Sequence, residues 1–306
     1  MLSAVALFGE ERDRAQRCLE HLLAQTALDR MEIVVVDMAR EPSPIPGLDH
    51  PNVRHFRISP LTTFGAGRAE CVRRSRGQFI AFLEDHSYPD PDWAAEVILA
   101  FDHDVDVVSY AVAAANPESL LGRMFLMCEY GRWMQPAISG HLSISASHNV
   151  AYRRRALDPF WSRLDRLCQT EFIMHRQMQA AGARLWLAAS AKVAHENWTQ
   201  LGYGLRANGL LRRLFAAERV REGHWDILTR IVWAGGMALT PPLHIARVAR
   251  SLVRRPALWP LFWASIPVMT MTYVTGSCFE AFGYLFGDAG CAEGFRDLEI
   301  SIERQV

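Results

Sequence analysis

The sequence has no closely spaced cysteines and no excess of charge of either sign. Its six cysteines are scattered, at positions 18, 71, 128, 168, 278 and 291, and no C-x-x-C pair is present. This spacing excludes a zinc knuckle or a disulfide framework and favours a reducing compartment. Lys and Arg together number 33, as do Asp and Glu, so the net charge is zero. We therefore expect no nucleic-acid partner.

The composition also excludes a disordered tail or a small disulfide scaffold. The 306 residues are 50% hydrophobic and 22% charged, which is enough to bury a sizeable core. The first 14 residues contain a short apolar run with no basic segment before it. We interpret this run as a first strand and not as a signal peptide.

Charge is unevenly distributed along the chain. Residues 200–260 contain ten arginines, at 206, 212, 213, 219, 221, 230, 247, 250, 254 and 255. Only Glu218, Glu222 and Asp226 oppose them in that segment. This local excess favours an anionic partner.

Apolar β-rich runs alternate with helical patterns over the first 115 residues. Strands are predicted at residues 3–8, 31–37, 53–58, 78–84 and 106–113, and helices at 11–25, 67–75 and 93–101. Further on, we predict a β-like run at 142–152, a helix near 171–181, a strand at 184–189 and a loop around His195. Strands joined by crossover helices indicate an α/β fold with a parallel, doubly wound sheet. Ligands of such sheets bind at the carboxyl ends of the strands.

Two groups of acidic residues follow predicted strands at that edge. Asp37 ends the run IVVVD, where a carboxylate accepts hydrogen bonds from a ribose or a base, although an Asp there also organises a turn. The segment RGQFIAFLEDHSYPDPDW delivers Glu84, Asp85 and His86 together. This tripeptide suits a divalent metal that bridges diphosphate oxygens, and a His ligand suits manganese better than calcium. The alternative is a solvated acidic turn.

The order of these motifs resembles that of a known family. The stretch SAVALFGEERDRAQRCLEHLLAQTALDRMEIVVVD, followed by GRAECVRRSRGQFIAFLEDHSYPDPDW, is similar to the nucleotide-sugar-binding half of the family 2 glycosyltransferases of GT-A fold. The similarity covers roughly residues 3–200. It implies a GT-A-like, Rossmann-type, mostly parallel sheet in residues 1–200, followed by a helical C-terminal region in 201–306.

The resemblance also implies roles for individual residues. Asp37 would contact the nucleoside, Arg68 and Glu84 would lie near the nucleotide, and Asp85 would take the metal–diphosphate position. The segment SASHNVAYRRRAL is similar to the acceptor-side segment of the family. In QTEFIMHRQMQAAGARLWLAASAKVAH, the alignment puts Glu171 at the catalytic base and His195 at a downstream His that helps to bind metal or diphosphate. The implied metal ligands are Asp85, His86 and His195, and the implied cofactor is Mn²⁺ or Mg²⁺.

The sequence departs from the family pattern at two positions. His86 stands where a third acid is usual, and Thr170 precedes Glu171 where a Glu-Asp pair is usual. The Q-x-x-R-W motif of processive enzymes is absent, which disfavours a polymer synthase. We expect His141, His148 and His175 to be polar or packed residues and not ligands.

The expected reaction is inverting transfer of a sugar from a UDP-, GDP- or TDP-sugar to a hydroxyl of a glycan or lipid-linked acceptor. One alternative is a binding protein for nucleotide sugars or glycans that has lost catalysis. A nucleotidyltransferase is disfavoured, because residues 8–12 supply two acids where a Gly-rich basic loop is needed.

The C-terminal region is predicted to associate with a membrane. Residues 257–286 contain a single charged residue, Glu280, and four arginines lie between residues 247 and 255. We expect residues 225–287 to hold the protein on the cytoplasmic face of the cell membrane. Prolines at 241, 242, 260 and 267 leave open whether the helices span the membrane or lie on it. A helical subdomain packed on the catalytic domain is the alternative.

Overall fold

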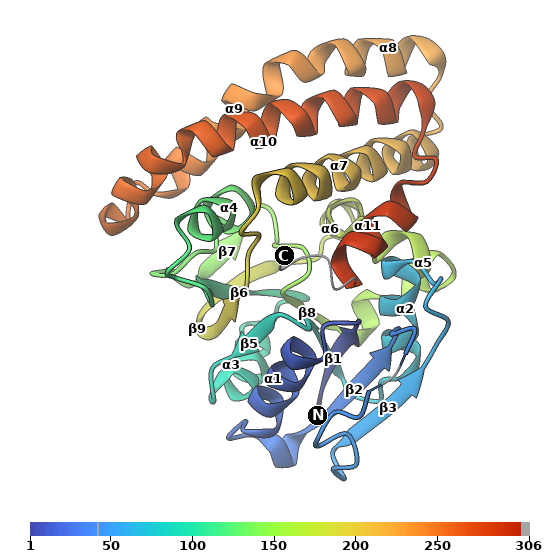
Figure 1. Ribbon diagram of the computed structural model, residues 1–306, viewed down its shortest axis with the longest axis vertical. Coiled ribbons are helices and arrows are strands. Elements are labelled where there is room, and N and C mark those ends of the chain that lie inside the picture. Colours follow the sequence, from blue (N-terminus) through green and yellow to red (C-terminus); the bar gives the residue numbers. More distant parts are fainter. Residues whose placement is uncertain (42, 301–306) are drawn as a thin grey trace. The chain divides into compact units, whose positions relative to one another are not determined.

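The computed structural model describes residues 1–41 and 43–300, which form two compact units (Figure 1). Unit 1 contains residues 1–115, 135–196 and 300, and unit 2 contains residues 116–134 and 197–299. The boundary predicted at residue 200 does not anticipate that 116–134 belongs with the C-terminal helices. These residues form α4 (Leu120–Tyr130), which packs against the long helix α10 (Trp259–Phe286).

Unit 1 is built around one sheet, and the predicted α/β fold is confirmed. The strand order is β3-β2-β1-β4-β8-β6-β9-β5, and β7 pairs with β9. The strands are β1 (Leu2–Phe8), β2 (Met31–Asp37), β3 (Val53–Arg57), β4 (Phe79–Glu84), β5 (Ser87–Pro89), β6 (Val107–Ala114), β7 (Gly140–Leu142), β8 (Val150–Arg153) and β9 (Leu185–His195). β3, β2, β1 and β4 are parallel, as are β6 and β9. Every residue of β1, β2 and β4 is buried, which explains why these strands are apolar almost throughout.

The middle of the sheet differs from the parallel arrangement that the sequence predicts. β8 runs antiparallel between β4 and β6. The predicted single run at 142–152 is wrong, because a segment of bends and irregular backbone separates β7 from β8. The predicted loop around His195 is also wrong. The strand continues past residue 189 because β6 and β5 both pair with its last residues, and His195 lies opposite Ala114 and Ser87.

Helices of unit 1 cover the sheet and carry part of the site. They are α1 (Arg12–Leu23), α2 (Phe64–Arg74), α3 (Trp93–Ala100), α5 (Leu164–Leu167) and α6 (Glu171–Ala180). α1 buries Ala15, Cys18, Leu19 and Leu22, four residues of the apolar face that the sequence predicts. The side chain of Thr63 caps α2 by accepting a hydrogen bond from the backbone N–H of Ala66.

The close approach of α2 and α5 requires glycine. A Cβ added at Gly65 would lie 2.5 Å from the carbonyl oxygen of Asp165, so a larger residue would push the two helices apart. Gln169 fixes the contact by accepting a hydrogen bond of 2.8 Å from the backbone N–H of Gly65. Since α6 begins two residues after Gln169, this contact brings Glu171 to the part of α2 that carries Arg68.

Unit 2 consists of helices. In addition to α4 and α10 it contains α7 (Leu201–Gly223), α8 (Ile227–Gly236), α9 (Thr240–Ser251) and most of α11 (Cys291–Ile300). The long helices α7 and α10 run side by side, and α8 and α9 pack along α10 (Figure 1). Pro267 lies inside α10 without ending it. Among the described residues, one helical stretch, Pro256–Phe286, is long and apolar enough to cross a membrane, and 39% of its most apolar window is buried within the protein.

Candidate active site

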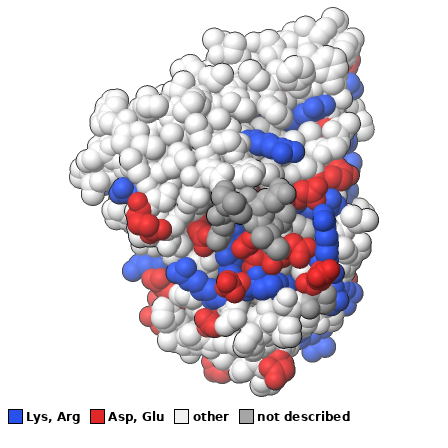
Figure 2. Space-filling model, viewed as in Figure 1, with Lys and Arg blue, Asp and Glu red and all other residues white. Residues whose placement is uncertain are grey.

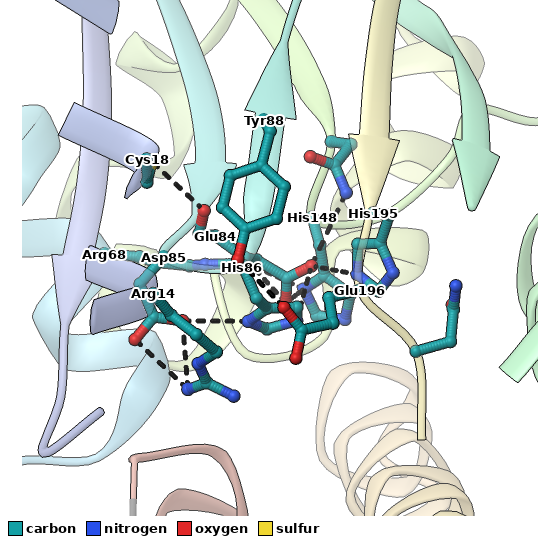
Figure 3. A network of polar contacts seen from close by, with 12 residues as sticks. Arg14, Cys18, Arg68, Glu84, Asp85, His86, Tyr88, His148, His195 and Glu196 are labelled. Carbon is teal, nitrogen blue, oxygen red and sulfur yellow. Dashed lines mark hydrogen bonds and ion pairs between the residues drawn. The ribbon is translucent and has the colours of Figure 1, made fainter. Parts of the chain in front are cut away.

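The acidic tripeptide lies at the carboxyl end of β4, where the sequence predicts a ligand site (Figure 3). Glu84 is the last residue of β4, and Asp85 and His86 form the turn into β5. β5 pairs with the end of β9, so the backbone N–H of Glu196 donates a hydrogen bond of 2.9 Å to the carbonyl oxygen of His86. This pairing brings His195 beside His86, with ring centroids 4.8 Å apart.

Three of these side chains form a group able to hold a metal ion. Glu84, His86 and His195 each offer one ligand atom, and the three atoms lie within 4.8 Å of one another. The Glu84 carboxylate is 3.0 Å from Nε2 of His195 and 3.8 Å from Nε2 of His86. Burial alone would raise the pKa of Glu84, but the histidine rings around it outweigh burial and hold that pKa well below its usual value. Glu84 is therefore an anion at neutral pH, as a metal ligand must be.

Asp85 is not one of these three ligands and contacts the group through His86. Its carboxylate is 2.8 Å from Nδ1 of His86 and 3.3 Å from the guanidinium of the buried Arg14. A hydrogen bond from Nδ1 to a carboxylate orients the ring and leaves Nε2 for a ligand. The geometry thus has Asp85 orienting His86, and Glu84 supplying the carboxylate of the group. The assignment of Asp85 as a direct metal ligand stays a prediction.

Asp37 occupies the end of β2, the second strand away from β4. Its carboxylate is fully buried and forms a two-pronged ion pair with Arg12, with distances of 3.1 and 2.9 Å. Nε2 of His55 lies 3.5 Å away. No contact joins Asp37 to the Glu84 group in the part of the chain that is described. Its expected role towards a nucleoside stays a prediction.

A second buried cluster contains the predicted base. Glu171, the first residue of α6, is fully buried and its Oε1 accepts a hydrogen bond of 2.6 Å from Nη1 of Arg68. Arg68 also lies 3.7 Å from Glu84, so one buried guanidinium bridges the predicted base and the candidate metal group. Nδ1 of His148 is 3.4 Å from Oε2 of Glu171.

The pKa values in this cluster are shifted by burial. Burial and the nearby Glu84 carboxylate raise the pKa of Glu171 to about 7, against the opposing effect of Arg68. Burial and the positive charge of Arg68 lower the pKa of His148 to about 3. Since an Arg only donates hydrogen bonds, the short contact between Arg68 and Nδ1 of His148 fixes a neutral imidazole with its proton on Nε2.

The sequence predicts His148 to be a polar or packed residue, and the structure places it against Arg68 and Glu171. Its backbone has φ of 72°, in the left-handed region that non-glycine residues rarely adopt. Such strain is common at functional sites. The signal available in the sequence was the resemblance of SASHNVAYRRRAL to the acceptor-side segment. His175, by contrast, is packed and buried as expected, with Nε2 2.7 Å from the hydroxyl of Tyr152.

Comparison with known proteins bears on the family and the fold. The family model described as glycosyl transferase family 2 matches residues 4–161. No curated protein sequence gives a significant match. Among solved structures, the mannosyltransferase PcManGT from Pyrobaculum calidifontis, in complex with GDP-Man and Mn²⁺, is 15% identical with a TM-score of 0.56, over 94% of this chain and 87% of that one. S. aureus TarS 1–349 is 12% identical with a TM-score of 0.50, over 92% and 90%. The chain has the GT-A fold and belongs to glycosyl transferase family 2.

Proposed function

We propose that this glycosyltransferase moves a sugar from a nucleoside diphosphate donor to a hydroxyl acceptor with inversion of the anomeric centre. The observation that carries the proposal is the buried group of Glu84, His86 and His195 at the carboxyl ends of β4 and β9, next to the Arg68–Glu171 ion pair. A UDP-, GDP- or TDP-sugar fits this proposal. The bound GDP-Man of PcManGT supports a nucleotide sugar as the donor.

The residues present fit a divalent metal. One carboxylate oxygen and two imidazole nitrogens form a mixed donor set that suits Mn²⁺ better than Ca²⁺. Glu84, His86 and His195 would hold the ion, and Asp85 would orient His86. When bound, the ion would neutralise charge on the leaving diphosphate. Mg²⁺ is the alternative, and the Mn²⁺ of the PcManGT complex supports the first choice.

Glu171 is the proposed general base. In an inverting transfer, the acceptor oxygen forms a bond to the anomeric carbon while the bond from that carbon to the diphosphate oxygen breaks on the opposite face. The carboxylate of Glu171 takes the proton of the acceptor hydroxyl. A pKa of about 7 suits this role, because a base is most effective when its pKa lies near the working pH.

The roles of the remaining residues follow from their charges and positions. Arg68 would keep Glu171 ionised and in place until the acceptor binds. Its guanidinium lies 3.7 Å from Glu84 of the proposed metal group, and its positive charge would attract the nucleotide phosphates there. Asp37 would accept hydrogen bonds from the nucleoside, after rearrangement of its pair with Arg12.

We further propose that the helical unit binds the cytoplasmic face of the cell membrane. The acceptor in this proposal is a glycan or a lipid-linked saccharide. Helix α8 has no buried residue, and Leu228 and Val232 are 70% and 73% exposed. Helix α10 packs along α7 and carries Glu280, whose buried carboxylate is ion-paired with Arg219. This packing favours helices that lie on the membrane over a single isolated span.

A binding protein without catalysis is the second candidate. The observation that favours it is the direct ion pair between Glu171 and Arg68, which occupies the proposed base. Turnover of UDP-, GDP- and TDP-sugars, measured with and without Mn²⁺, tests both. Release of nucleoside diphosphate that requires Mn²⁺ supports the transferase. Tight donor binding with neither transfer nor hydrolysis supports the binding protein.

A further inference from the structure

Four arginines of unit 2 gather around one histidine. Arg132 follows α4, Arg212 and Arg219 lie on α7, and Arg247 lies on α9 one turn after His244. The chain next to Arg132 packs against α9 next to Arg247, since a Cβ added at Gly131 would lie 2.9 Å from Cγ1 of Val248. Nε2 of His244 is 3.5 Å from Nη1 of Arg212, and its ring is 5.2 Å from the ring of Tyr273 on α10. We call Arg132, Arg212, Arg219 and Arg247 the arginine cluster.

The surroundings of His244 show how concentrated the positive charge is. Burial and the charges of all four members of the cluster lower the pKa of His244 to about 3. The ring is therefore neutral at physiological pH and adds no charge. Its two nitrogens remain able to exchange hydrogen bonds with a ligand or with the guanidinium groups.

Two carboxylates lie near the four members of the arginine cluster: Glu280 on α10, and Glu129 on α4, whose charge acts on Tyr273 together with those of Arg132 and Arg212. Glu280 accepts hydrogen bonds from Arg219 at 2.9 Å and from Arg212 at 3.4 Å, so one carboxylate serves two guanidinium groups. Arg132 and Arg247 form no ion pair with any described residue. Burial and the charge of Arg247 lower the pKa of Arg132. Four guanidinium groups thus share two nearby carboxylates, and a bound anion would relieve the repulsion that remains.

Exposed apolar side chains lie on the two helices that carry His244 and Tyr273. Leu243 and Val274 are both 46% exposed, and each is the sequence neighbour of a ring in the cluster's surroundings, His244 or Tyr273. Across the visible face of helices α8 to α10, most side chains carry no charge (Figure 2). An anionic group that is attached to an apolar chain would satisfy both the charge and the apolar surface.

We propose that Arg132, Arg212 and Arg247 bind a phosphate or diphosphate group. Guanidinium groups bind phosphate oxygens through paired hydrogen bonds, and these three lie on three different segments of the helical unit. Arg219 stays with Glu280, which also accepts a hydrogen bond from Arg212. The site lies wholly within unit 2 and uses none of the residues of the candidate active site.

The test compares two double variants of the full-length chain. R132Q/R247Q removes the two arginines that lack a carboxylate partner. R250Q/R254Q removes the same charge from two exposed positions nearby and serves as the control. Binding is measured by flotation with phosphatidylcholine vesicles that contain phosphatidic acid, and by calorimetric titration of inorganic phosphate without divalent metal.

We expect R132Q/R247Q to bind phosphatidic acid vesicles about tenfold more weakly than R250Q/R254Q, because it loses charge-assisted hydrogen bonds as well as general attraction. If calorimetry detects binding of inorganic phosphate, and R132Q/R247Q again binds more weakly than R250Q/R254Q, the free ion is sufficient for binding. Vesicle binding without detectable phosphate binding identifies a lipid phosphate. Equal behaviour of the two double variants, or no binding of either probe by the parent, overturns the proposal.

Folding is checked independently. Arg132 is half-buried and Arg247 is exposed, and removing both like charges relieves repulsion. The thermal midpoint of R132Q/R247Q should therefore equal or exceed that of the parent without phosphate. Added phosphate should raise the midpoint of the parent and not that of R132Q/R247Q. The variant R132K/R247K keeps the charge but loses the paired donors. We expect it to bind less tightly than the parent, and binding equal to the parent's contradicts recognition by guanidinium groups.

Discussion

Replacement of Glu171 by Gln is the most direct test of the proposed chemistry. Gln keeps the size of the side chain and can still accept a hydrogen bond from Arg68, but it cannot take a proton from an acceptor hydroxyl. A general base contributes about 10²–10⁴-fold in rate, so E171Q should lower kcat by about that factor. Donor affinity should change little, because donor contacts are assigned to other residues.

The structure also sets the pH dependence of this step. The base acts as the carboxylate, and burial raises the pKa of Glu171 to about 7. Activity should therefore fall as the pH drops below about 7, where Glu171 becomes protonated. In the parent, kcat/KM should decrease about tenfold per pH unit on that acidic limb. E171Q should lose this limb, a change that a purely structural role would not produce.

Stability must be separated from catalysis in this variant. Removing one partner of a buried ion pair typically costs about 3–5 kcal/mol. The cost should be smaller here, because Glu84 remains 3.7 Å from Arg68 and the amide oxygen of Gln remains an acceptor. Thermal unfolding and calorimetric titration of the donor nucleotide measure both effects on the same protein.

Glu196 provides the matched control. Its Oε2 accepts a hydrogen bond of 2.9 Å from the hydroxyl of Tyr88, and it is the next carboxylate along from His195. E196Q should retain the turnover and pH profile of the parent. The assignment of Glu171 as the base would be refuted if E171Q kept the turnover of the parent, or if E196Q, and not E171Q, lost the acidic limb of the pH profile. Either result would make Glu196 the candidate base.

Three further expectations concern metal, nucleotide and membrane. In a calorimetric titration, E84Q should weaken Mn²⁺ binding more than D85N does, because Glu84 belongs to the ligand group and Asp85 orients His86. A larger loss of affinity in D85N would restore Asp85 as the direct ligand. In the same assay Mn²⁺ should bind more tightly than Mg²⁺ because two of the three ligands are imidazoles, and equal affinities would count against histidine ligation. D37A should weaken binding of UDP, GDP or TDP by about tenfold or more, since it removes a buried charged acceptor, and unchanged affinity would end its nucleoside role. L228D/V232D should move the full-length chain from the membrane fraction of a cell lysate to the soluble fraction. L61D changes an equally exposed leucine of unit 1 and should leave the chain in the membrane fraction. A parent chain that is soluble without detergent would contradict membrane association.

Local sequence patterns were sufficient to predict the elements that carry the site. The β-branched run before Asp37 and the apolar run before Glu84 can be recognised as strands without their partners, because both faces of a central parallel strand are buried. The acidic tripeptide directly after β4 therefore had to lie at the carboxyl edge of the sheet. The apolar spacing of α1 predicted the helix face that packs inside.

Only the tertiary structure decided which of these residues meet. Glu84 and His195 are 111 residues apart in the chain, and Arg68 and Glu171 are 103 apart. Their contacts depend on the pairing of β5 with the end of β9 and on the approach of α5 to Gly65, neither of which leaves a periodic signal in the sequence. The same applies to the arginine cluster. The sequence showed ten arginines between residues 200 and 260, but the packing of three separate segments determined that Arg132, from outside that range, lies near Arg212 and Arg247. Among the described residues, the arginines that Glu280 pairs with are Arg212 and Arg219, and not Arg132 or Arg247.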